Sequence, residues 1–219
     1  RSAIHALDAE GCDLMNSRAT AYHHGDLRNA LILAAAELIE ERGSADFAMV
    51  DAARRAGVSS AAPYRHFRDK TALLDAVIDF AFFALGEQVQ TAVQTQPPGS
   101  AEAIIAIGKA YIRFMREHRA FYGLMWGDAG IRALQERPSD ERSAAGFYVL
   151  MSAVEAWCAQ NPVDERDVLQ LSIKLWSMAH GLAGIALYGH VERFLPQADV
   201  FSLLESSTHT FLEGLRKRC

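Results

Sequence analysis

The most chemically distinctive stretch of the chain lies between Gly57 and Lys70. It reads GVSSAAPYRHFRDK and places a Tyr, a His and three cationic side chains within a few positions of one another. Cationic side chains bind phosphate by charge, and hydroxyl and imidazole groups add hydrogen bonds. The whole chain has a formal net charge of −5, but salt confines electrostatic fields to ~8–10 Å, so a local cationic patch is compatible with that total.

The residues around Gly57 have the spacing of two short helices joined by a tight turn. Ala53 is small enough for two helix backbones to cross, and Gly57 tolerates the positive φ that the turn needs. Val58 then supplies an apolar side chain beneath the pair. This is the helix-turn-helix pattern, whose second helix enters the major groove of DNA. The alternative is an ordinary helical hairpin whose basic residues form a solvated face.

We expect the second helix to begin at a cap formed by Ser59 or Ser60 and to end near Phe67, which anchors it on the first helix of the domain. If Ser59 is the cap, Pro63 occupies the fourth helical position, at the limit of the first turn, where a missing amide hydrogen is tolerated. The small residues at the tip suit close approach to bases, and the others suit phosphate contacts. The predicted DNA contacts in this region are Ser59, Ser60, Ala61, Ala62, Tyr64, Arg65, His66 and Lys70.

Helical periodicity dominates the rest of the chain, and no segment shows convincing strand alternation. A first amphipathic helix follows Asp26 and ends at Gly43, and Asp69 caps a later helix with a long apolar stripe. QTQPPGS at 94–100 is a clear break. Further helices are expected at about 47–55, 101–118, 121–128, 140–160, 165–189 and 199–216.

The predicted fold class is therefore all-α, with about nine helices. We expect a flexible extension over residues 1–20, a three-helix helix-turn-helix DNA-binding domain over 21–70, and a larger helical domain over 71–219.

Composition narrows the class of protein. Half of the residues are apolar, and Cys12, Cys158 and Cys219 form no CxxC pair, which favours a reducing, cytoplasmic compartment. The most apolar late run, 175–189, is too short to span a membrane. The sequence lacks a phosphate-binding glycine loop, HExxH and G-x-S-x-G. We therefore predict a protein that is not an enzyme, with no catalytic residues, metal, cofactor or membrane partner.

The stretch from Leu27 to Val77 resembles the DNA-binding domain of TetR-type transcriptional repressors. The resemblance is carried by ERG at 41–43 and by VDAARRAGVSSAAPYRHFRDKTALLDAV at 50–77. Its YRHFRDKTALL part is close to that family's pattern of Tyr-x-His-Phe-x-(small or acidic)-Lys-x-x-Leu-Leu. The chain departs from the family at Pro63, where a bulky aliphatic residue is more usual.

Two further stretches carry weaker resemblances. TAYHHGDLR at 20–28 is similar to an arm that precedes the first helix in part of the family, so His23 either contacts DNA or belongs to a helix cap. LWSMAHGLAGI at 175–185 resembles a Trp-x-x-x-His-Gly pattern in one class of TetR-type C-terminal domains. There His180 either bonds an effector or is a buried His bonded to protein.

The resemblance implies a homodimeric repressor that leaves a palindromic double-stranded DNA operator when a small, largely apolar effector binds the larger domain. The last two long helices would form the dimer interface, and the bulky run from Tyr111 to Trp126 would contribute to the pocket wall. The candidate effector contacts are Phe80, Phe83, Phe114, Met115, Tyr122, Met125, Trp126, Phe147, Met151, Trp176 and His180. Core packing is the alternative for each. The rival functions are a ligand-independent DNA-binding protein and a small-molecule binding protein without DNA binding.

Overall fold

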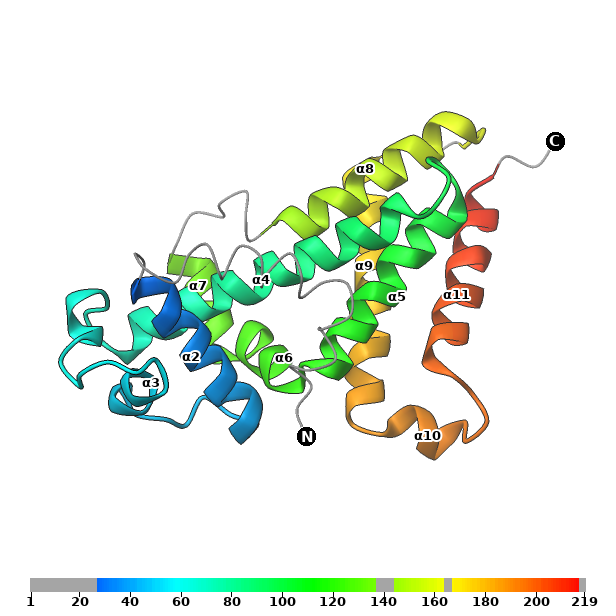
Figure 1. Cartoon of the computed structure of the whole chain (residues 1–219). Coiled ribbons are helices and arrows are strands. Elements are labelled where there is room, and N and C mark those ends of the chain that lie inside the picture. The colour runs from blue at the N-terminus through cyan, green and yellow to red at the C-terminus, as the bar shows by residue number, and fades with distance from the viewer. Residues whose placement is uncertain (1–26, 137–143, 164–166, 217–219) are drawn as a thin grey trace. The chain divides into compact units, whose positions relative to one another are not determined.

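A computed structural model describes residues 27–136, 144–163 and 167–216. Over these ranges the fold is all-α, as predicted, with ten α-helices and one 3₁₀ turn (Figure 1). The elements are α2 (Leu27–Arg42), α3 (Met49–Arg55), η2 (Pro63–Arg65), α4 (Lys70–Gln94), α5 (Ala101–Glu117), α6 (Arg119–Trp126), α7 (Asp128–Glu136), α8 (Ala145–Gln160), α9 (Val168–Leu187), α10 (His190–Phe194) and α11 (Val200–Leu215).

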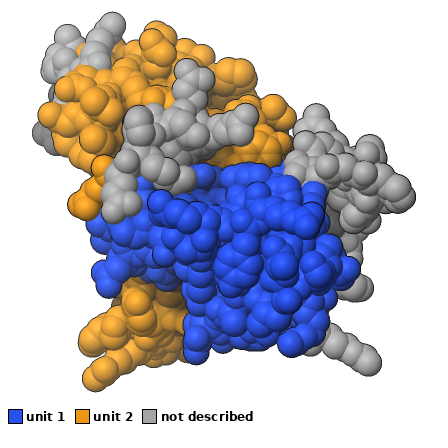
Figure 2. All heavy atoms as spheres, turned by 90° about the vertical axis from the view of Figure 1, so that its left-hand side faces the viewer, with its two compact units in different colours: residues 1–80, 120–133 blue, residues 81–119, 134–219 orange. Residues whose placement is uncertain are grey.

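The chain forms two compact units (Figure 2). Unit 1 comprises residues up to Phe80 together with Ala120–Ala133, and unit 2 comprises Ala81–Arg119 and the chain from Leu134 onward. The chain passes from one unit to the other within α4, α6 and α7. The expected linear boundary at residue 70 therefore differs from this division, in which the first part of α4 and most of the α6–α7 segment belong with the helix-turn-helix.

Unit 1 is built on the apolar face of α2. Leu31, Ala35 and Ile39 on this helix are fully buried, as the period of the sequence predicts. The helix ends before Gly43, whose φ of +68° is a conformation that glycine adopts without strain. Phe47 and Phe67 add large buried rings to the same core.

Unit 2 is a bundle in which α5 packs against α8, α9 and α11. Its helices begin at side-chain caps that follow the breaks in the sequence. The Ser100 hydroxyl accepts a hydrogen bond from the Ala103 amide at 3.1 Å, Asp167 accepts from Gln170 at 3.0 Å, and Asp199 accepts from Ser202 at 3.1 Å. The large side chains buried within the bundle include Ile112, Met115, Trp157, Leu171 and Leu204.

Two short helices, α7 and α10, were not predicted. The GDAG sequence at 127–130 indicates a break, but the break is only a single residue long. The Gly127 amide bonds to the Gly123 carbonyl at the end of α6, and the Gly127 carbonyl accepts from Ile131 in α7. One residue, Gly127, therefore ends one helix and begins the next, and the helix that follows the break was not predicted. None of the described helices is long and apolar enough to cross a membrane.

The junction of α6 and α7 requires glycine at position 130. A Cβ atom there would collide with the backbone carbonyl of Met125. We expect Gly130→Ala to lower the free energy of unfolding by at least ~2 kcal/mol, because backbone atoms cannot move aside as a flexible side chain can.

Gly123→Ala is the matched control, since Gly123 lies exposed inside α6 with no atom near the added methyl group. It should leave stability unchanged or raise it by up to ~1 kcal/mol. Denaturant unfolding of both variants measures the difference, and equal stability would contradict the proposed collision.

Candidate nucleic-acid interface

The helix-turn-helix spacing predicted from the sequence is present in unit 1. Ala53 on α3 is buried, and Gly57 has φ of +71°. The turn is closed by hydrogen bonds from the Val58 amide to the Ala53 carbonyl at 3.0 Å and from the Gly57 amide to the Arg54 carbonyl at 3.2 Å. Val58 is half-buried beneath it.

The segment after this turn is not the α-helix that was expected over 59–67. It forms one 3₁₀ turn, η2, preceded by a bend. Pro63 has no amide hydrogen with which to reach the Ser59 carbonyl, which instead accepts from the Ala62 amide at 3.0 Å. Arg65 donates to Ala62 at 3.2 Å, and His66 to Pro63 at 3.0 Å, so the short i→i+3 pattern continues.

This turn has a buried side and an exposed side. Pro63 and Phe67 are buried, and they hold the turn against unit 1. Tyr64 is 60% exposed, and Arg65 and His66 are exposed beside it. Ser59, Ser60 and Ala61 are exposed as predicted.

Ala62 is a correction to the predicted DNA contacts. It is 9% exposed, because its methyl group belongs to the buried side of the turn with Pro63, so this side chain is not available to a base edge. His23 lies outside the described residues.

Two cations at the edge of this region lie over aromatic rings. The Lys70 ammonium group is 4.8 Å from the centre of the Phe47 ring, and the Arg28 guanidinium is 5.3 Å from that of Phe67. Such contacts orient a long side chain while its charge stays close to the surface. The anchoring role expected for Phe67 is confirmed by its burial beneath a residue of α2.

Asp69 caps α4, as predicted. Its Oδ1 accepts from the Ala72 amide at 2.8 Å, and its Oδ2 accepts from Arg68 at 2.9 Å. The Ala72 amide, followed by Arg68, lowers the pKa of the Asp69 carboxyl. The charge of Arg68 is thus paired within the protein, whereas no described residue forms an ion pair or side-chain hydrogen bond with Arg65.

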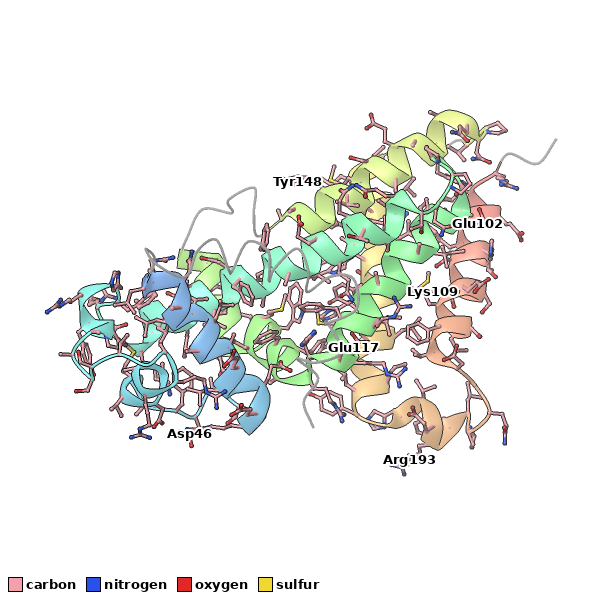
Figure 3. All side chains as sticks on the ribbon, in the orientation of Figure 1. Asp46, Glu102, Lys109, Glu117, Tyr148 and Arg193 are labelled. Atoms are coloured by element: carbon pink, nitrogen blue, oxygen red, sulfur yellow. The ribbon has the colours of Figure 1, made fainter. Side chains whose placement is uncertain are left out.

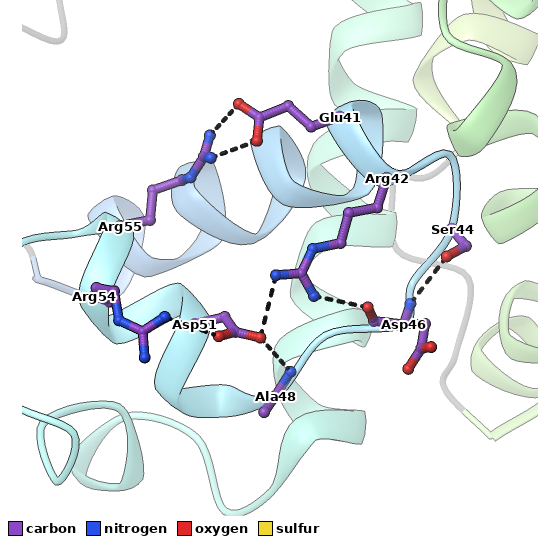
Figure 4. A network of polar contacts seen from close by, with 8 residues as sticks. All are labelled: Glu41, Arg42, Ser44, Asp46, Ala48, Asp51, Arg54 and Arg55. Atoms are coloured by element: carbon purple, nitrogen blue, oxygen red, sulfur yellow. Dashed lines mark hydrogen bonds and ion pairs between the residues drawn. The ribbon is translucent and has the colours of Figure 1, made fainter.

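The remaining arginines of the helix-turn-helix are bound to carboxylates (Figure 4). Arg55 on α3 donates to both carboxylate oxygens of Glu41 on α2 and to Glu37 at 3.2 Å. Arg42 donates to Asp51 at 3.3 Å and to the Asp46 carbonyl at 2.9 Å. The pKa of Glu41 is lowered, chiefly by its hydrogen bond to Arg55.

Asp51 is the centre of the second group of contacts. It accepts from the Ala48 amide at 3.1 Å, which caps α3, and from Arg54 at 3.4 Å as well as from Arg42. The Ala48 amide is the largest cause that lowers the pKa of its carboxyl. Arg42 and Arg55 therefore join α2 to α3, whereas Arg54 pairs with Asp51 within α3; each of the three charges lies beside a carboxylate.

The predicted effector residues divide between the two units. Phe80, Tyr122, Met125 and Trp126 belong to unit 1, and Phe83, Phe114, Met115, Phe147, Met151, Trp176 and His180 belong to unit 2. Met115, Phe114 and Met125 are buried, as core packing requires, and Phe83 is exposed.

Within unit 2 the structure brings four rings together. The Phe147 and Trp176 ring centres are 6.1 Å apart, and those of Trp176 and His180 are 5.7 Å apart. Tyr111, expected only as part of a bulky run, lies with its hydroxyl 2.6 Å from His180 Nδ1. Burial lowers the pKa of His180.

No group of three or more His, Cys, Asp or Glu side chains within the described ranges is arranged to hold a metal ion.

The pKa shift of Asp51 predicts how the helix-turn-helix responds to acid. The charged form is stabilised by folding, so its contribution is present above the ordinary pKa of 3.8 and is lost as the pH falls through the lower folded value. We expect Asp51→Asn to lower the midpoint of thermal unfolding at pH 7, and this deficit to shrink below about pH 3.8.

Asp46→Asn is the control, because Asp46 contributes its backbone rather than its carboxylate to the network in Figure 4. Thermal unfolding at pH 7, 5 and 3 measures both variants. A deficit in Asp51→Asn that does not change with pH would contradict this assignment.

Comparison with known proteins supports the same interpretation of both parts of the chain. Residues 31–77 match the model of bacterial regulatory proteins of the tetR family, and residues 104–208 match that of the tetracyclin repressor-like C-terminal domain. The HTH-type transcriptional regulator BetI of Escherichia coli (strain K12 / DH10B) is 40% identical over 75 residues, which are 34% of this chain and 38% of BetI. The chain thus matches well under half the length of this curated relative.

Several solved structures share the fold, among them a regulator of the TetR family. A protein of unknown function from Rhodococcus sp. RHA1 is 28% identical with a TM-score of 0.71, over 90% of this chain and 98% of that one. A TetR-family regulator from Pectobacterium atrosepticum is 22% identical with a TM-score of 0.65, over 87% and 94%. RolR in complex with resorcinol is 17% identical with a TM-score of 0.60, over 86% of each chain. With both family models matched in order, this chain belongs to the TetR family of transcriptional regulators.

Proposed function

We propose that the protein is a sequence-specific DNA-binding regulator whose contacts to DNA come from the exposed side of the 59–66 turn. The observation that supports this most strongly is the contrast between its cations. Arg42, Arg54 and Arg55 are bound to carboxylates, whereas Arg65 is exposed and has no ion-pair partner among the described residues. A neutralised arginine is poorly placed to bind phosphate, so the charge that DNA meets is concentrated at the turn.

The roles within the turn follow from side-chain size and chemistry. Tyr64, Arg65 and His66 have donors that reach phosphate oxygens. Ser59, Ser60 and Ala61 are short and exposed, so they permit close approach to base edges. Lys70 adds a phosphate contact from the start of α4, although its position over Phe47 limits its reach.

We further propose a homodimer that binds a palindromic operator. One side of α9 exposes large apolar side chains at Leu169, Ile173, Ile185 and Tyr188, with Ser177 and Gly181 between them. Apolar surface of this kind is covered in many proteins by a second copy. Two copies would present two turns to successive major grooves, with half-sites about one helical repeat (~34 Å) or more apart.

The protein is proposed to act as a repressor that a small, largely apolar effector releases from DNA. Unit 2 supplies aromatic side chains for such a ligand, and α4 runs along the chain from unit 1 into unit 2. An effector that binds a DNA-incompetent state ~100-fold better than the competent one shifts the balance by about 2.7 kcal/mol. The resorcinol complex of RolR is one case of a protein with this fold that binds a small aromatic molecule.

Substitution of the turn tests the DNA contact. Arg65→Ala is expected to weaken binding to every duplex and to reduce the slope of log K against log salt by about one, because one phosphate contact is lost. Tyr64→Ala should weaken operator binding while the dimer remains intact. Fluorescence anisotropy measures both, with the operator taken from selection of bound genomic fragments.

Arg113→Ala is the control, since Arg113 is an exposed arginine of unit 2. It should bind the operator as the unsubstituted protein does. Unchanged affinity and salt slope in Arg65→Ala would defeat the proposed phosphate contact. A protein that selects no DNA fragment, yet binds small aromatic molecules, would favour the function of a ligand-binding protein without DNA binding.

A charge on the exposed face of α9 tests the dimer. Ile173→Asp is expected to convert the dimer to a monomer, because burying an unpaired carboxylate costs more than an interface contact contributes. Ile131→Asp places the same charge at an exposed isoleucine of unit 1 and should leave the mass unchanged. Analytical ultracentrifugation gives the mass, and a dimeric Ile173→Asp protein would exclude this face.

A further inference from the structure

The aromatic cluster of unit 2, comprising Tyr111, Phe147, Trp176 and His180, differs from the core around it. Trp157 on α8 is 1% exposed and is an ordinary core residue, whereas Trp176, Phe147 and His180 are each only half-buried. The rings come from α5, α8 and α9, and neighbouring centres lie 5.7–6.1 Å apart. This spacing is typical of interacting aromatic pairs, and Phe147, Trp176 and His180 remain partly accessible to solvent.

A polar pair lies at the buried end of the cluster. Tyr111 is 5% exposed, and its hydroxyl lies 2.6 Å from His180 Nδ1. If the hydroxyl donates to Nδ1, His180 carries its proton on Nε2; with the opposite tautomer, Nδ1–H donates to the hydroxyl oxygen. In both arrangements the pair combines donor and acceptor groups in a neutral state, which burial favours by lowering the pKa of His180.

The helical surroundings of these four residues carry no formal charge. The side chains one turn away on α5 are Ile107, Gly108, Phe114 and Met115. On α9 they are Ser172, Ile173, Ser177, Ala179, Ala183 and Gly184; around Phe147 the described ones are Leu150 and Met151 on α8 and Ala144 at its N-cap. An ion placed among them would lose hydration without gaining a counter-charge from these positions, which is strongly unfavourable.

We propose that this aromatic cluster is a recognition site for an uncharged planar aromatic ligand that carries one hydroxyl or carbonyl group. Trp176 and Phe147 supply the faces against which the ligand ring packs. The Tyr111–His180 pair supplies the hydrogen bond that distinguishes the oxygenated ligand from a plain hydrocarbon. The inference rests on the proposed function, because it names the chemical class of the effector.

Three probes with the same fused ring separate the possible ligand classes: naphthalene, 2-naphthol and 2-naphthoate. Binding to the full-length protein is measured by isothermal titration and by quenching of tryptophan fluorescence. We expect 2-naphthol to bind about ten times more tightly than either of the other two, since one compensated hydrogen bond is worth about that factor.

Tyr111→Phe removes the hydroxyl while keeping the ring, so it should abolish the preference for 2-naphthol over naphthalene. Tyr148→Phe is the matched control, because Tyr148 is exposed on α8 (Figure 3) and should retain the preference. Trp176→Leu, a second variant outside the polar pair, should weaken naphthalene and 2-naphthol equally. Thermal unfolding and operator binding without ligand establish that each variant is folded.

Several results would overturn the inference: tightest binding of 2-naphthoate, a preserved preference in Tyr111→Phe, or no binding of any probe. They leave the proposed function standing as long as the same samples bind the operator. Loss of operator binding in the unsubstituted protein would count against the proposed function instead, whatever the probes do.

Discussion

The missing amide hydrogen of Pro63 is the constraint on which the candidate interface depends. Without it the Ser59 carbonyl accepts from Ala62, and the segment closes as one 3₁₀ turn rather than as an α-helix. The ring of Pro63 is buried, so the residues that follow are directed outward. Tyr64, Arg65 and His66 are exposed because of this local geometry, with Phe67 as the second anchor.

The contacts between α2 and α3 set the electrostatic character of the same surface. Arg42, bound to Asp51, and Arg55, bound to Glu41 and Glu37, contribute to the geometry of the helix pair rather than to the external field. Exposed ion pairs of this kind contribute little to stability individually. Their importance here lies in how they distribute charge over the surface. Arg42 and Arg55 are paired with carboxylates, whereas Arg65 is exposed and can bind a polyanion.

The elements set by local chemistry were the ones predictable from sequence. The cap at Asp69, the break at Gly57 and the burial of Phe67 all follow from residue type and spacing. The prediction of an α-helix over 59–67 was wrong. It assumed that a first helical turn begins at Ser59 and tolerates Pro63, whereas the Ser59 carbonyl accepts from Ala62 and the only helical turn begins at Pro63. The helix α7 was missed because Gly127 and Gly130 were interpreted as a break, whereas the backbone hydrogen bonds of Gly127 end α6 and begin α7 within one residue.

Contacts between distant positions were beyond sequence reasoning. Tyr111 and His180 are 69 residues apart, so no periodic pattern pairs them. The neutralisation of Arg55 by Glu41 and the burial of Ala62 likewise depend on packing between elements. Most of the exposed residues of the turn were predicted from the sequence. Only the structure distinguished Arg65 from the arginines that are paired with carboxylates.

The most direct test of the central claim is an NMR titration of the protein with its operator duplex, monitoring backbone amides and arginine side chains. The account predicts large shifts for residues 59–66 and for the Arg65 guanidinium, with little change at those of Arg42 and Arg55. Shifts confined to the paired arginines, with residues 59–66 unaffected, would contradict it.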